Sequence, residues 1–187
     1  MGKQNSFDKL LSRSLAEQQL IEFQRSVPPA TTEHGFVVGI GRRWVLFHMV
    51  KDAIALDGYQ AVRHRDIARA RREPRKFSER LLALRGHGPI VLAGIDLDRT
   101  RDLLRSATKQ FRIAAVHLEY DEPENCYVGA AGGFDDSTFQ LHEISPEAKW
   151  LPKRYRYTYK SISRVDFDGT YERALLELAD ARHRRNH

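Results

Sequence analysis

Hydrophobic and polar residues change their period within one stretch near the C-terminus, residues 155–178. From Tyr155 to Tyr159, tyrosines alternate with polar residues, which is the period of a strand with one buried face. The apolar content continues to Phe167, and Asp168-Gly169 is a turn signal. Apolar residues then recur at helical spacing from Tyr171 to Leu178. The stretch therefore predicts a strand followed directly by a helix.

A weaker copy of this unit lies earlier, at residues 59–84. Ile67–Ala70 aligns with Ile162–Val165, and the apolar residues of the following segments align as well. The alignment predicts that the chain consists of two related modules.

Three further helices are predicted from apolar spacing and terminal residues, at residues 6–25, 74–85 and 96–108. Short apolar runs bounded by turn residues predict the strands, at residues 36–40, 44–50, 53–56, 59–63, 66–69, 90–93, 111–120, 126–134 and 138–144. Short strands joined locally favour a small, strongly bent antiparallel sheet or barrel in each module. The predicted organisation is an N-terminal helix and linker (1–30), a first module (31–86), a connecting strand and helix (87–110) and a second module (111–187).

Several sequence strings indicate a family. The run GFVVGIGRRWVLFHMVKDAIALDGYQAVRHRDIARA and the later strings ISRVDF and YERAL resemble an uncharacterised bacterial family with tandem Sm-like or SH3-like small β-barrel modules. The resemblance covers most of residues 34–179. It implies an α+β, mainly β fold: two small antiparallel barrels with N-terminal, inter-module and C-terminal helices. It implies no activity.

The residues that bind uridine in Sm proteins are not present in the matching positions. Asp52–Leu56 lacks the expected asparagine, and Arg65-Asp66 and Arg164-Val165 stand where an Arg-Gly pair would be sought. A shared fold does not by itself imply a shared ligand, so the uridine pocket is not transferred to this chain.

Charge is distributed unevenly along the chain. The formal net charge is +6 and the pI is about 9.6. Residues 63–80 contain eight Lys and Arg residues against three acidic ones, whereas residues 119–147 contain eight acidic residues and no Lys or Arg. Such asymmetry bears on partner choice and self-association, but not on fold.

The basic stretch is the strongest candidate for function, because clustered guanidinium groups neutralise phosphates with little sequence preference. The predicted nucleic-acid-binding residues are Arg65, Arg69, Arg71, Arg72, Arg75 and Lys76. The partner would be RNA or DNA, and the protein a noncatalytic, nucleic-acid-associated or regulatory binding protein. The alternative is a solvated charged face, or a surface that contacts another protein or the acidic face of a second copy.

The sequence gives little support for a reactive cysteine, a metal site or an enzyme active site. The single cysteine, Cys126, is interpreted as a small core residue. His117 with Glu119 and His142 with Glu143 are the only histidine and acid neighbours on facing strands, and their directions do not predict a shared metal site. No nucleophile motif or duplicated carboxylate indicates an enzyme. We therefore predict no catalytic residue, no metal and no cofactor.

The sequence contains no apolar run of the roughly 18 residues that a membrane span needs, and its N-terminal residues lack the pattern of a signal peptide. These features predict a cytoplasmic protein without membrane contact.

Overall fold

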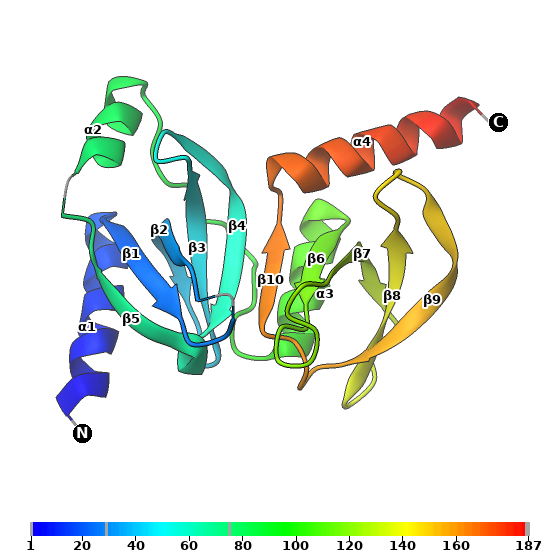
Figure 1. Cartoon of the computed structure of the whole chain (residues 1–187), viewed down its shortest axis with the longest axis horizontal. Coiled ribbons are helices and arrows are strands. Elements are labelled where there is room, and N and C mark those ends of the chain that lie inside the picture. Colours follow the sequence, from blue (N-terminus) through cyan, green and yellow to red (C-terminus); the bar gives the residue numbers. More distant parts are fainter. Residues whose placement is uncertain (1, 29, 75, 186–187) are drawn as a thin grey trace.

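The computed structural model describes residues 2–28, 30–74 and 76–185, with side chains described for residues 6–28, 30–74 and 76–182. Within these residues the protein is mainly β, with a ten-stranded antiparallel sheet and helices on both of its faces (Figure 1). The strands are β1 (Leu20–Arg25), β2 (Thr32–Ile40), β3 (Trp44–Lys51), β4 (Ala55–Arg63), β5 (Ile67–Arg72), β6 (Ala114–His117), β7 (Cys126–Gly132), β8 (Thr138–Ile144), β9 (Trp150–Thr158) and β10 (Arg164–Phe167). The helices are α1 (Gly2–Glu17), α2 (Phe77–Leu84), α3 (Thr100–Phe111) and α4 (Thr170–Arg185), and a single 3₁₀ turn, η1, covers His64–Asp66.

The strand order is β5-β1-β2-β3-β4-β10-β6-β7-β8-β9. The first half (β1–β5) and the second half (β6–β10) thus have the same order, with the last strand of each half beside its first. The prediction of two small closed barrels is wrong, because β4 pairs with β10 and joins both halves into one continuous sheet. This pairing hydrogen-bonds two strand edges that separate modules would have left exposed.

Strand registers show that the halves repeat in detail. Gly35 lies opposite Met49 and Gly129 lies opposite Glu143, so the two glycines occupy corresponding positions. A Cβ at Gly35 would lie 3.2 Å from the carbonyl oxygen of His48, and a Cβ at Gly129 would lie 2.2 Å from that of His142. The register shifts directly after both histidines. The same close approach and the same irregularity therefore recur in each half.

The helices cover different faces of the sheet. α1 packs on the face of the first half that carries Phe23 and Phe47, whose rings stack at 4.1 Å. α4 packs through Leu175 and Ala179 on the same face of the second half. α3 covers the opposite face, where one apolar cluster extends across both halves. Figure 1 shows α1 beside the first half and α4 along the second.

The predicted helix over residues 6–25 is too long. α1 ends at Glu17, Gln18 has a positive φ of 49°, and residues 20–25 form β1. Leu20 and Ile21 are both fully buried although they point to opposite faces. A strand covered on both faces has a continuous apolar pattern, which cannot be told from a helix by periodicity alone.

The single strand predicted from Tyr155 to Phe167 is two strands, β9 and β10, separated by a turn. β9 lies at the end of the sheet, so Tyr155 is 44% exposed. The apolar spacing of the helix predicted over residues 74–85 places Phe77 and Leu84 on its inner face, but both are exposed. Tyr171 and Leu178 of α4 are exposed as well. Residues 90–93 form no strand, and Cys126 is exposed, not a core residue.

A buried ion pair links the two halves beside the β4–β10 junction. Arg25 of β1 donates two hydrogen bonds, of 2.5 and 2.9 Å, to the carboxylate of Glu119, which follows β6. Arg25 also donates to Glu33 at 3.1 Å, and the Ser163 hydroxyl donates to Glu119 at 2.6 Å. Burial raises the pKa of Glu119, but the hydrogen bonds from Arg25 and Ser163 and the charge of Arg164 lower it more, so the net shift is downward.

We expect Glu119→Gln to lower the free energy of unfolding by about 3 kcal/mol at neutral pH, because it leaves the Arg25 guanidinium buried without its main partner. Urea unfolding followed by tryptophan fluorescence measures this loss. Because the folded-state pKa of Glu119 lies below its ordinary value of 4.5, the pair contributes fully above that value and is lost as the pH falls through the folded pKa. The difference between wild type and variant should therefore shrink in acid. Arg13→Gln, which removes one member of an exposed pair with Glu17, is the control and should cost less than about 0.5 kcal/mol.

Candidate functional site

The basic strand β5 lies at one end of the sheet, where it pairs only with β1. Arg69, Arg71 and Arg72 are all exposed there. The side chains of Arg69 and Arg72 make no hydrogen bond or ion pair with any part of the chain that the structure describes. Both guanidinium groups are therefore available to a ligand. Three of the predicted residues thus lie on this one exposed strand, with Arg69 and Arg71 on one of its faces and Arg72 on the other.

A groove runs between α1 and the strands β1 and β5, and we call it the β5 groove. It has a volume of about 830 Å³. Phe7 and Leu10 of α1 contribute apolar surface, and the three exposed arginines of β5 line it on the other side. Such a combination can hold a phosphate backbone electrostatically while bases or sugars contact the apolar side.

Two further predicted residues, Arg65 and Lys76, do not line this groove. Arg65 donates a hydrogen bond to the Tyr120 hydroxyl at 3.2 Å and lies 3.5 Å from Asp66, so it is already engaged. Hydrogen bonding to Tyr120 raises the pKa of Arg65 above its ordinary value. Lys76 is exposed just before α2, and Arg75 lies outside the described residues.

Glu22 of β1 holds Arg71 in place. Arg71 donates two hydrogen bonds, of 2.8 and 2.9 Å, to the two carboxylate oxygens of Glu22, its cross-strand partner. These bonds raise the pKa of Arg71. Arg71 thus differs from Arg69 and Arg72, because its charge is largely balanced within the protein.

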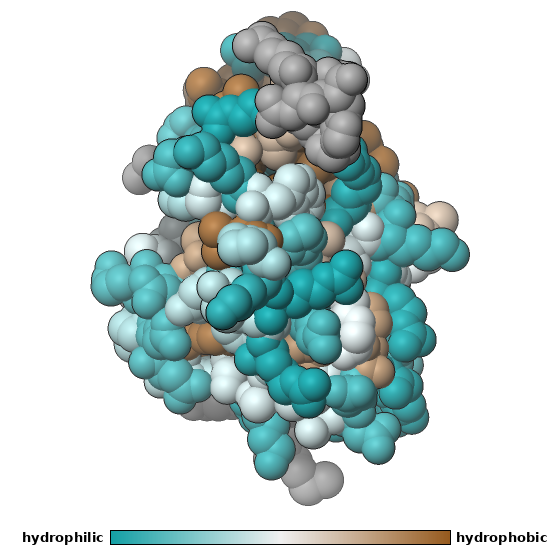
Figure 2. All heavy atoms as spheres, turned by 90° about the vertical axis from the view of Figure 1, so that its right-hand side faces the viewer, coloured by the Kyte–Doolittle hydropathy of each residue, from teal (hydrophilic) through white to brown (hydrophobic). Residues whose placement is uncertain are grey.

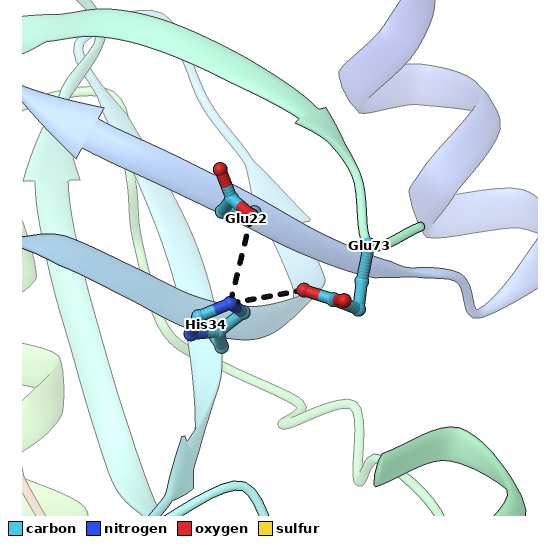
Figure 3. A group of neighbouring side chains, drawn as sticks. All are labelled: Glu22, His34 and Glu73. Atoms are coloured by element: carbon cyan, nitrogen blue, oxygen red, sulfur yellow. Dashed lines mark ion pairs between the residues drawn. The ribbon is translucent and has the colours of Figure 1, made fainter. Parts of the chain in front are cut away.

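Glu22 also belongs to a cluster with His34 and Glu73, which converge from β1, β2 and the residues after β5 (Figure 3). His34 Nε2 lies 2.9 Å from Glu73 and 3.9 Å from Glu22. One ligand atom of each residue lies within 4.8 Å of the others, a set of one nitrogen and two oxygens that could hold a divalent cation such as Zn²⁺. Arg71 would compete with that cation for Glu22.

Sequence reasoning missed this cluster. Its residues are 12 and 39 positions apart, taken from 22 to 34 and from 34 to 73, and only strand pairing brings them together. The pairing of β1 with β2 places Glu22 directly opposite His34, but no local pattern indicated it, because residues 20–25 were predicted as helix.

The two histidine and acid pairs considered from the sequence are engaged elsewhere. His117 Nε2 lies 3.0 Å from Asp166, and Glu119 belongs to the buried pair with Arg25. His142 Nε2 lies 2.9 Å from the carbonyl oxygen of Leu151, and Glu143 accepts a hydrogen bond from the Tyr157 hydroxyl.

A second basic strand lies at the opposite end of the sheet and was not predicted as a site. β9 carries Lys153, Arg154 and Arg156, all exposed, and no acidic residue. Figure 2 looks onto this end of the molecule, where hydrophilic residues predominate and hydrophobic ones form small separate patches. Both ends of the sheet are therefore basic.

Comparisons with known proteins assign no family to this arrangement. No protein-family model, curated protein or solved structure matches the chain. Among the described helices, none combines the length and the apolar character needed to span a bilayer.

We expect Glu22→Gln to strengthen the binding of anionic ligands to the β5 groove, because it removes the carboxylate that balances Arg71. The slope of log affinity against log salt concentration should steepen by up to about 1, the increment for one further phosphate contact. Titration of a fluorescent single-stranded oligonucleotide at several salt concentrations measures both effects. An unchanged affinity and slope would show that Arg71 does not face the ligand.

Proposed function

We propose that this protein binds nucleic acid, without catalysis, through the β5 groove and the exposed arginines at its rim. The observation that carries the proposal is that Arg69 and Arg72 are exposed and unpaired among the described residues. Paired surface arginines are partly neutralised, whereas unpaired ones keep their full charge for a phosphate.

The lining of the groove supports nucleic acid as the ligand. Its lining combines arginine side chains with the apolar side chains of Phe7, Leu10 and Phe23. Aromatic and apolar surface beside guanidinium groups is typical of sites that accept single-stranded nucleic acid with little sequence preference. The overall charge of +6 would assist the encounter with a polyanion. A cytoplasmic location, predicted from the sequence, would give access to such a ligand.

A second candidate is a protein interaction at the same end of the sheet. β5 pairs with β1 on one side only, and an exposed strand edge can accept an extended segment of a partner. The two candidates differ in their dependence on salt, because backbone pairing does not require charge neutralisation.

The test is fluorescence anisotropy of the purified protein with labelled single-stranded RNA, single-stranded DNA and duplex DNA over a salt series. We expect Arg69→Glu with Arg72→Glu to weaken binding by more than about tenfold near 0.15 M salt and to reduce the salt slope by about 2. Circular dichroism should show an unchanged fold, since both side chains are exposed.

The matched control is Arg99→Glu, directly before α3, together with Lys109→Glu in the last turn of α3. It changes the net charge by the same amount, and both side chains are exposed away from the β5 groove. If this control loses as much affinity as the β5 variant, the binding reflects net charge and the proposed site is wrong.

A further inference from the structure

The repeated topology leaves two complementary strand edges at the ends of the sheet. Within the chain, the fourth strand of the first half, β4, pairs antiparallel with the fifth strand of the second half, β10. The fourth strand of the second half is β9, and the fifth strand of the first half is β5. These two are the terminal strands of the sheet. At one end of the sheet, β9 is therefore the counterpart of β4, and at the other end β5 is the counterpart of β10.

We propose that copies of this protein join head to tail, with β9 of one copy pairing with β5 of the next in the geometry that β4 and β10 have within one chain. The inference concerns a second copy of the chain and does not rest on the proposed function.

Strand registers identify the residues that would meet. His48 lies opposite Tyr59 and His142 lies opposite Arg154, so Arg154 of β9 corresponds to Tyr59 of β4. Two residues further along, Arg156 corresponds to Ala61.

The last strands of the halves, β5 and β10, can be aligned through the first strands, β1 and β6, with which they pair. Ile21 of β1 lies opposite Gly35, and Ala114 of β6 lies opposite the matching Gly129, so Ile21 corresponds to Ala114. One residue further along, Glu22 corresponds to Ala115. Arg71 lies opposite Glu22 and Asp166 lies opposite Ala115, so Arg71 corresponds to Asp166. One residue earlier on these last strands, Ala70 corresponds to Val165.

The internal junction then sets the register between copies. Ala61 lies opposite Val165 within the chain, so Arg156 of one copy would lie opposite Ala70 of the next. The other pairs follow from the same register: Arg154 with Arg72, Tyr155 with Arg71, and Tyr157 with Arg69.

The direction of the backbone groups agrees with this register, although it was not used to derive it. The N–H of Glu73 donates to the carbonyl of Leu20 at 3.0 Å. In an antiparallel pair, successive residues point alternately toward and away from the partner strand. Ala70 and Arg72 therefore direct their N–H and C=O groups away from β1, toward the outer edge.

The same reasoning applies to β9. The N–H of Tyr159 donates to the carbonyl of Ser137 at 3.1 Å, so Arg154 and Arg156 direct their backbone groups away from β8. The register derived above places these outward groups opposite those of Ala70 and Arg72. The register taken from the internal junction and the backbone directions on β5 and β9 thus agree on which residues would form hydrogen-bonded pairs.

Side chains at this interface have mixed effects. On one face, Tyr155 and Tyr157 would lie beside Arg71 and Arg69, where guanidinium groups favour contact with aromatic rings. On the other face, Arg154 would oppose Arg72, a like-charge pair that salt screens. Association should therefore strengthen as salt concentration rises, whereas nucleic-acid binding weakens.

Because the two edges differ, the interface is head to tail and can extend to a closed ring or a filament. A two-fold dimer, in which the same edge of both copies meets, is not expected.

The experiment uses proline to block each edge separately. Ala70→Pro removes the outward N–H of β5, and Arg156→Pro removes that of β9; proline is tolerated on edge strands where the lost N–H faces outward. Analytical ultracentrifugation of nuclease-treated, nucleic-acid-free protein at about 0.15 M and about 1 M salt measures the assembly.

We expect wild type to form species heavier than the 21.6 kDa chain, and more of them at the higher salt concentration. Each proline variant alone should be monomeric, and an equimolar mixture should form a heterodimer of twice that mass, because one partner supplies an intact β9 and the other an intact β5. Formation of the heterodimer also shows that both variants are folded. Ala70→Thr keeps the N–H and should assemble like wild type.

Three results would overturn the proposal: wild type that is monomeric at both salt concentrations, a proline variant that still dimerises alone, or variants that do not associate when mixed. None of these results depends on whether nucleic acid binds.

Discussion

The pairing of β4 with β10 is the interaction on which the rest of the structure depends. It is antiparallel, runs over four residue pairs from Tyr59 with Phe167 to Val62 with Arg164, and places two apolar surfaces side by side on one face. Without it, both halves would expose an unpaired strand, and the apolar cluster that extends across both halves would be divided. Nearby polar contacts reinforce the junction. Arg63 donates to the carbonyls of Ile162 and Tyr159, each at 2.6 Å, and Asp57 accepts from the backbone and hydroxyl of Thr170 at the start of α4.

The sequence predicts the repeat better than it predicts the junction. The alignment of Ile67–Ala70 with Ile162–Val165 agrees with the strand registers, which place Ala70 and Val165 at corresponding positions. Alternation and turn residues also located most strands. They could not show that the modules share one sheet, because pairing between distant strands leaves no local pattern. The segment 20–25 was misassigned for a related reason, since a strand buried on both faces loses its alternation.

The candidate site, like the fold, was only partly predictable from the sequence. A cluster of arginines on one strand is visible in the sequence, and β5 presents Arg69, Arg71 and Arg72 on the surface. The sequence does not show which of these arginines forms an ion pair, because this depends on the residue opposite each one on β1. Arg71 lies opposite Glu22 and is paired, whereas Arg69 lies opposite Gln24, which offers no charge. The convergence of Glu22, His34 and Glu73 likewise arises from three chain segments that only the folded sheet brings together.

The matching glycines of the two halves bear on the origin of the chain. Gly35 and Gly129 face the backbone of His48 and His142, and the register shifts after each histidine. A shared irregularity of this kind is the pattern expected when a gene for one half is duplicated and fused. On that history, the ancestral halves were separate chains that met as β4 and β10 meet now. Fusion replaced an encounter that depends on concentration with one between tethered partners, at an effective concentration in the millimolar range.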